Sequence, residues 1–157
     1  MAIRIVYYSW KGHTEKVATA LAKHLDAELV RIEPVNEGSA LGKGLKALFN
    51  MKSPIKPMKT DLDGVDTLVI ASPVWVGKVP AYVNQYLDSV SGASGIPFHV
   101  IVEMGGRGDQ SAIAIVRTAL ERKGMKFISS ASTIEKFVEN GSFTGTIEKF
   151  ADAIRKQ

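Results

Sequence analysis

Short apolar runs alternate along this chain with longer segments of helical spacing, and this alternation constrains the fold more than any other feature. The apolar runs are rich in β-branched residues, which favour strands. We predict strands at residues 3–8, 28–32, 67–71, 98–103 and 126–133. Regular alternation of strands and helices is typical of βαβ units, in which parallel strands form one sheet and helices cover its faces.

The segments between the strands carry apolar residues at intervals of three and four, which indicates amphipathic helices. In the first of them, Val17, Leu21 and Leu25 fall on one face. We predict helices at residues 13–25, 40–50, 80–89, 110–123 and 144–156. The pattern therefore predicts an α/β fold, a three-layer, doubly wound, five-stranded parallel sheet that residues 1–157 form as a single domain.

The composition narrows the functions open to such a domain. With 45% hydrophobic residues the chain can cover both faces of a sheet, and without cysteine any redox chemistry must come from a bound cofactor. The net charge of +4 is spread along the chain, so we expect no nucleic-acid partner. No apolar run reaches the roughly 18 residues of a membrane span and no secretory signal is evident, so we expect a cytoplasmic protein without a membrane span.

In a doubly wound sheet ligands bind at the carboxyl ends of the strands, so the loops that follow Tyr8, Ala71 and Glu103 are the candidates for a site. The first loop comprises Ser9, Trp10, Lys11, Gly12, His13 and Thr14. Hydroxyl groups and a glycine at a helix start present O–H and backbone N–H groups to an anion, which suits a phosphate. The loop lacks the Walker A and dinucleotide spacings, so it favours a phosphate monoester. An ordinary capped turn is the alternative.

The other two loops have residue types that suit a flat ring. The loop after the third strand comprises Ser72, Pro73, Val74, Trp75, Val76 and Gly77. Its tryptophan can stack on a planar ring, the alternative being that it packs on a neighbouring helix. The loop after the fourth strand comprises Met104, Gly105, Gly106, Arg107, Gly108 and Asp109. Its glycines let backbone amides approach a heterocycle closely, although a flexible turn has the same composition.

The first two loops resemble the signatures of the flavodoxin family. The segment from Tyr8 to Ala18 is similar to the phosphate-loop pattern S/T-x-T-G-x-T before an amphipathic helix, and that from Ser72 to Gly77 looks like the flavin-facing turn P-x-[WY]-x-G. The resemblance covers essentially the whole chain and implies the strand order 2-1-3-4-5 with FMN as the cofactor. It also implies that the first loop holds the FMN phosphate, that the second lines the isoalloxazine with Trp75 against its face, and that the third contacts its edge.

Departures from the family pattern bear on the function. Lys11 replaces a small hydroxyl residue, His13 takes a position often filled by Asn, and the loop after the fourth strand has no aromatic residue, which implies one open flavin face. We expect a flavoprotein acting in electron transfer, with a redox partner protein. The alternative is an NAD(P)H-dependent oxidoreductase of the quinone or flavin reductase type, and a homodimer is possible. A cofactor-free regulatory module of the same fold is a further alternative.

The basic segment of residues 36–59 has an undecided role. Its apolar residues share one helical face that lysines surround: Leu41, Leu45, Leu48 and Phe49, with Lys43, Lys46 and Lys52. We expect a surface helix whose apolar face lies on the core. The alternative is a lid or a docking surface for an acidic partner or a dinucleotide.

No side chain is assigned as a catalytic acid or base, because in flavin chemistry the cofactor accepts the electrons and the protein tunes it. Glu103, at a strand end beside the expected site, is a candidate for such tuning. His13, His24 and His99 show no metal-ligand spacing, so we expect no metal site. His24 and His99 are expected to be structural.

Overall fold

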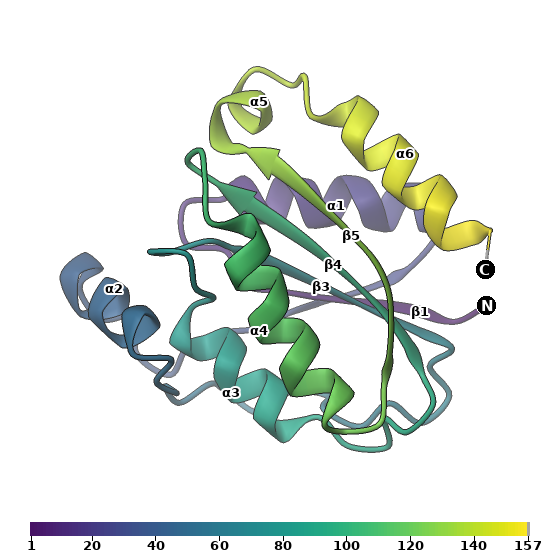
Figure 1. Ribbon diagram of the computed structural model, residues 1–157, viewed down its shortest axis with the longest axis horizontal. Helices are drawn as coiled ribbons and strands as arrows, with labels where there is room; N and C mark the ends of the chain where they lie inside the picture. The colour runs from purple at the N-terminus through teal and green to yellow at the C-terminus, as the bar shows by residue number, and fades with distance from the viewer. Residues whose placement is uncertain (157) are drawn as a thin grey trace.

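The computed structural model describes residues 1–156, which form a five-stranded parallel sheet between layers of helices (Figure 1). The strands are β1 (Ile3–Tyr7), β2 (Glu28–Arg31), β3 (Thr67–Pro73), β4 (Pro97–Met104) and β5 (Lys126–Ile134). Their order is β2-β1-β3-β4-β5, so the predicted doubly wound α/β sheet with order 2-1-3-4-5 is confirmed. The order reverses at β1, which has β2 on one side and β3 on the other.

Helices cover both faces of the sheet, with α1 and α6 on one face and α3 and α4 on the other (Figure 1). Their bounds are α1 (His13–Leu25), α2 (Ala40–Leu48), α3 (Ala81–Ser89), α4 (Asp109–Glu121), α5 (Glu135–Glu139) and α6 (Thr144–Arg155). The short helix α5 was not predicted from the sequence. Among residues 1–156, no helix is long and apolar enough to cross a membrane.

The central strands distribute apolar residues between two cores. Ile5 and Val69 belong to the core beneath α1 and α6, whereas Val6 and Ile70 belong to the core beneath α3 and α4. All four side chains are fully buried. Burying such a side chain contributes about 1.5–3 kcal/mol, so the middle of the sheet is a firm platform for the loops at its carboxyl edge.

Strands β3 and β4 are both longer than predicted. β3 continues through Ser72 to Pro73, which lies in register opposite Glu103, and β4 extends by one residue at each end. Ser and Pro are poor strand formers, but pairing with β4 overrides that preference at the end of a strand. Ser72 is accordingly fully buried in the sheet, and its predicted position in a loop is wrong.

The face of α2 that is buried is the opposite of the face that was predicted to be buried. Its large apolar side chains, 44% to 84% exposed, are Leu41, Leu45, Leu48 and Phe49. Lys43 and Ala47 are buried instead, so the expected apolar face on the core is wrong. The Lys43 ammonium pairs with the Glu37 carboxylate and lies 4.5 Å from the centroid of the Trp10 ring. A lysine can dock a helix in this way because its stem is apolar and its head pairs with a carboxylate and an aromatic face.

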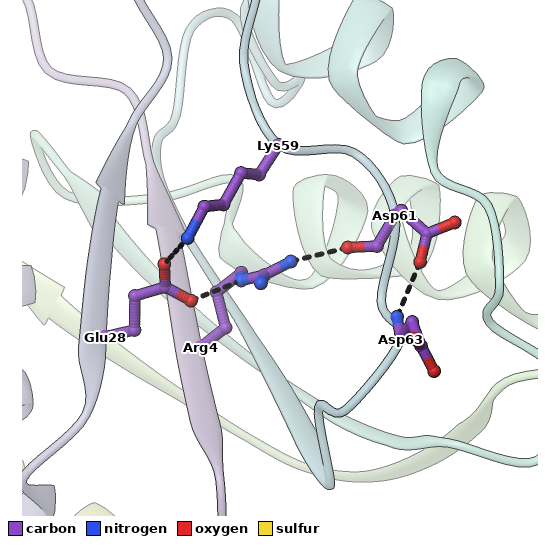
Figure 2. A network of polar contacts seen from close by, with 5 residues as sticks. All are labelled: Arg4, Glu28, Lys59, Asp61 and Asp63. Atoms are coloured by element: carbon purple, nitrogen blue, oxygen red, sulfur yellow. Dashed lines mark hydrogen bonds and ion pairs between the residues drawn. The ribbon is translucent and has the colours of Figure 1, made fainter.

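A charge network ties together the amino-terminal edge of the sheet (Figure 2). Arg4 in β1 is only 6% exposed and donates hydrogen bonds to the Glu28 carboxylate at 2.7 Å and to the Asp61 carbonyl at 2.6 Å. Lys59 donates to the same carboxylate at 2.7 Å, and the Asp61 side chain accepts from the Asp63 N–H at 2.6 Å. The hydrogen bonds from Lys59 and Arg4 lower the pKa of Glu28. The network therefore fastens the edge strand β2 to the segment before β3.

Candidate functional site: a pocket at the carboxyl edge of the sheet

A pocket of about 330 Å³ opens where β1, β3 and β4 end. Its walls are formed by Ser9, Trp10, Lys11, His13, Thr14, Pro73, Val74, Trp75, Glu103, Met104, Gly105 and Glu135. Residues from all three predicted loops thus line one cavity beside the point where the strand order reverses. Doubly wound sheets bind ligands at this place.

The loop between β1 and α1 presents backbone amides at the start of the helix. The Ser9 hydroxyl accepts a hydrogen bond from the Gly12 N–H at 3.1 Å, and Gly12 has a left-handed φ of 93°. Gly12 is the N-cap of α1 and has no side chain, so no capping side chain covers the first amides of the helix. Thr14, in the first turn, is buried and lines the pocket. This geometry suits an anion and differs from a side-chain-capped turn.

Two tryptophans form an aromatic wall. The ring centroid of Trp75 lies 5.9 Å from that of Trp10 and 5.8 Å from that of Tyr8, and the rings of both pairs are nearly perpendicular. Such edge-to-face contacts fix the orientation of the indole. Trp75 is only partly buried and lines the pocket, so it packs on aromatic neighbours and also faces the cavity.

The turn that carries Trp75 is strained. The Trp75 and Lys78 N–H groups donate to each other's carbonyl at 2.8 and 2.9 Å. The two residues between them, Val76 and Gly77, have φ angles of 53° and 71°. A β-branched residue at positive φ is an outlier that costs about 1–3 kcal/mol and persists only where the surrounding structure holds it.

Gly108, the N-cap of α4, packs directly on this turn. A Cβ atom at Gly108 would lie 2.8 Å from the Gly77 Cα, and Gly108 has a φ of 97°. The loops after β3 and β4 therefore touch through their backbones. Gly105 and Gly106 differ, because a Cβ atom at either position would meet nothing within 4 Å. The rim of the site is open at these two residues.

Acidic residues occupy the remaining side of the pocket. Glu103, 7% exposed at the end of β4, accepts a hydrogen bond from the Thr14 hydroxyl at 3.4 Å. Burial is the main cause that raises the pKa of Glu103, and His13 opposes the rise. Glu135, at the start of α5, also lines the pocket. Glu135 was not predicted as a site residue from the sequence. It directly follows β5, so the strand-end rule applied to the fifth strand would have found it.

Some predicted site residues do not line the pocket. They are Gly12, Ser72, Val76, Gly77, Gly106, Arg107, Gly108 and Asp109. The Ser72 hydroxyl is buried and donates to the Pro73 carbonyl at 2.9 Å. Gly77 and Gly108 join two loops, as described above. Contact of any one of these residues with a cofactor stays a prediction.

The residues present fit FMN. The amides and hydroxyls at the start of α1 suit a phosphate monoester, Lys11 adds a positive charge there, and Trp75 offers a planar surface for a ring. The cavity also lies in the usual range of small-molecule sites, about 300–1,000 Å³. Trp75 and the start of α1 line the same cavity, so one ligand with a ring and a phosphate can reach both.

Residues 1–139 match the protein family described as NADPH-dependent FMN reductase. Two similar curated proteins are the NAD(P)H dehydrogenases (quinone) of Acidovorax ebreus and Cupriavidus metallidurans, with 21% and 24% identity over 94 residues, or 57% of this chain. The matches cover 46% and 47% of those proteins, so the chain spans about half the length of these relatives.

Solved structures share the fold over nearly the whole chain. A flavoprotein from Lactobacillus acidophilus NCFM in complex with FMN has a TM-score of 0.73 at 22% identity, covering 90% of this chain and 98% of that one. Oxidised flavodoxin 2 from Bacillus cereus has a TM-score of 0.68 at 18% identity, covering 99% of both chains. The flavodoxin-like fold that the sequence predicted is thereby confirmed.

Proposed function

Since the chain belongs to the NADPH-dependent FMN reductase family, we propose that it is an NAD(P)H-dependent FMN oxidoreductase of the quinone or flavin reductase type. Membership of this family confirms the expectation that the chain is a flavoprotein with FMN as its cofactor. The nicotinamide donor and the acceptor are the parts that we propose. Bound FMN supplies the ring nitrogen that accepts a hydride, and the protein supplies position and environment.

The open rim at Gly105 and Gly106 is the observation that carries the proposal. Direct hydride transfer requires the nicotinamide to stack on the flavin at close range. Because these glycines have no side chains and free space around them, the loop after β4 leaves room for a second flat molecule. Trp75, held edge-on by Trp10 and Tyr8, would orient the flavin ring against the opposing wall.

Positive charge beside the pocket supports a phosphate-bearing donor. The ammonium groups of Lys11 and Lys43 lie 5.5 and 4.5 Å from the centroid of the Trp10 ring, and Trp10 lines the pocket. Such charges raise the local concentration of an anionic dinucleotide. Lys46 and Lys52 are engaged elsewhere, with Ser53 and Asp88. Lys43 is likewise buried and paired with Glu37. Lys11, which is exposed and lines the pocket, is therefore the lysine that we assign to donor capture.

An anaerobic absorbance titration of the FMN-loaded protein with NADPH and NADH tests the proposal. We expect prompt bleaching of the flavin band by at least one nicotinamide. Lys11→Gln, compared with the wild type at equal FMN loading, should slow the bleaching, whereas the matched variant Lys126→Gln, at the opposite edge of the sheet, should behave as wild type. Reduction by dithionite alone would overturn the proposal and leave the electron carrier as the function.

An electron carrier with a redox partner protein is the second candidate, and the exposed apolar side chains of α2 favour it. The same surface would suit a homodimer. Sedimentation velocity tests the dimer, with Leu45→Asp expected to convert it to a monomer and a wild-type monomer at all concentrations counting against it. The cytoplasmic location is likewise a proposal, and fractionation of the source cells tests it.

A further inference from the structure

One histidine and two glutamates gather at the edge of the pocket, between α1 and α5. His13 Nδ1 lies 3.1 Å from Glu135 Oε1, and His13 Nε2 lies 3.4 Å from Glu139 Oε1. One nitrogen or oxygen atom from each residue lies within 4.8 Å of the others. The glutamates are four residues apart in α5 and so share one face of the helix. The start of α1 brings His13 to that face.

The charges of this cluster are not balanced. A neutral imidazole has a single N–H and can donate to only one of the two carboxylates that face its ring nitrogens. In the part of the chain that the structure describes, His13 is the only partner within ion-pair distance of Glu135 and Glu139. Both carboxylates also act on buried Glu103 and help to raise its pKa. The cluster therefore has a surplus of negative charge close to the start of α1.

A buried hydroxyl without a partner lies on the strand that leads into this cluster. Thr133 is 3% exposed, and its Oγ1 has no hydrogen-bond partner among residues 1–156. Thr133 is in register opposite Glu103, so the two side chains lie on the same face of the sheet. Buried hydroxyls are nearly always paired, and a bound water or ion is a common partner where no protein group serves.

We propose that His13, Glu135 and Glu139 bind a divalent transition metal ion of the zinc type. Imidazole nitrogen and carboxylate oxygen are both zinc ligands, and a site with three protein ligands keeps a fourth coordination position open. Tetrahedral ligands about 2.1 Å from zinc lie about 3.4 Å from one another, so the side chains must close by at most about 1.4 Å. His13 and Glu135 also line the pocket. The open coordination position of the metal ion would therefore face the pocket, near the start of α1.

Magnesium is the poorer match for this cluster. It prefers octahedral oxygen ligands and keeps several waters, whereas imidazole nitrogen favours the later first-row ions. The sequence concealed the site because its ligands come from segments more than a hundred residues apart, without a compact spacing. Only the meeting of α1 with α5 brings them together.

Isothermal titration of the FMN-free chain with Zn²⁺ tests the site without relying on the proposed activity. We expect one Zn²⁺ per chain with a Kd on the order of micromolar, and at least about 100-fold weaker binding of Mg²⁺. Glu139→Gln should weaken Zn²⁺ binding at least about tenfold, and Glu135→Gln with Glu139→Gln should abolish it. Glu148→Gln, an exposed glutamate on α6, is the matched control and should bind as wild type.

Visible absorption after titration with Co²⁺ gives a second measurement on the wild-type chain. Intense d–d bands that Zn²⁺ displaces would support a low-coordinate site at His13. Absence of Zn²⁺ binding, or equal binding by the double variant and the wild type, would overturn the proposal. Circular dichroism of each variant shows whether the fold is retained.

Binding of the ion should also strengthen FMN binding, and this consequence rests on the proposed position of the FMN phosphate. A divalent cation beside the start of α1 would offset the carboxylates that otherwise repel a phosphate. We expect Zn²⁺ to lower the Kd for FMN several-fold in the wild type and to have no effect in the double variant. A Zn²⁺-bound protein whose FMN affinity is unchanged would separate the metal site from the phosphate site.

Discussion

Replacing Gly108 by alanine should destabilise the FMN-free protein by about 4 kcal/mol. Two independent penalties add at this position. The φ of 97° is unfavourable for a side chain by about 1–3 kcal/mol. The new Cβ would also lie 2.8 Å from the Gly77 Cα, well inside normal carbon–carbon contact, and overpacking of this kind costs about 1–3 kcal/mol.

Gly141→Ala is the matched control, because Gly141 has a φ of 80° but nothing within 4 Å of its Cβ position. It should carry only the conformational penalty, about 1–3 kcal/mol. Urea unfolding followed by circular dichroism gives both values, and quenching of flavin fluorescence gives the FMN affinity. Gly108→Ala should also weaken FMN binding by separating the loops after β3 and β4, whereas Gly141→Ala should not. Equal losses of stability in the two variants would refute the role of the Gly77 contact.

Three further outcomes are expected. Hydrogen bonds from Lys59 and Arg4 lower the pKa of Glu28 in the folded state. The Glu28 carboxylate therefore contributes to the free energy of unfolding above its unfolded pKa of about 4.3, and this contribution is lost as the pH falls through the folded-state pKa. In urea unfolding, the stability difference between wild type and Glu28→Gln should therefore shrink between about pH 6 and pH 3; a constant difference would contradict this. Val76→Asn should raise the free energy of unfolding by about 1 kcal/mol, because Asn tolerates a φ of 53° better than Val does, and a decrease would show that Val76 is not strained. Trp75→Leu should raise the Kd for FMN about tenfold in a fluorescence titration through the loss of about 1.4 kcal/mol of ring contact, and an unchanged Kd would mean that the flavin does not rest on Trp75.

The sequence predicted the sheet well because burial leaves a strong local pattern. Strands covered on both faces must be apolar nearly throughout, as β1 and the first five residues of β3 are, and their helices must repeat apolar residues every three to four positions. The position of the pocket could be predicted from the same strand assignments. Once the strands were assigned, the rule for doubly wound sheets directed attention to their carboxyl ends, and the loops after β1, β3 and β4 do meet there.

Residue-level geometry at the site could not be read in the same way. The strain at Val76 depends on the turn closed by Trp75 and Lys78, and a valine there gives no local sign of positive φ. Ser72 and Pro73 looked like loop residues because their intrinsic preference is against a strand. The neighbouring strand β4 supplies the hydrogen bonds that keep Pro73 in register with Glu103.

By itself the sequence determined the α/β class, the helical periodicity and the three strand-end loops, since these depend on residue types close together along the chain. Only the tertiary structure decided which way α2 faces and which acids join the pocket. Periodicity reports which residues share a face of α2, but the pairing of Lys43 with Glu37 and Trp10 decides which face is buried. Likewise Glu135 reaches His13 because parallel strands end at a common edge, a proximity that separation along the chain conceals.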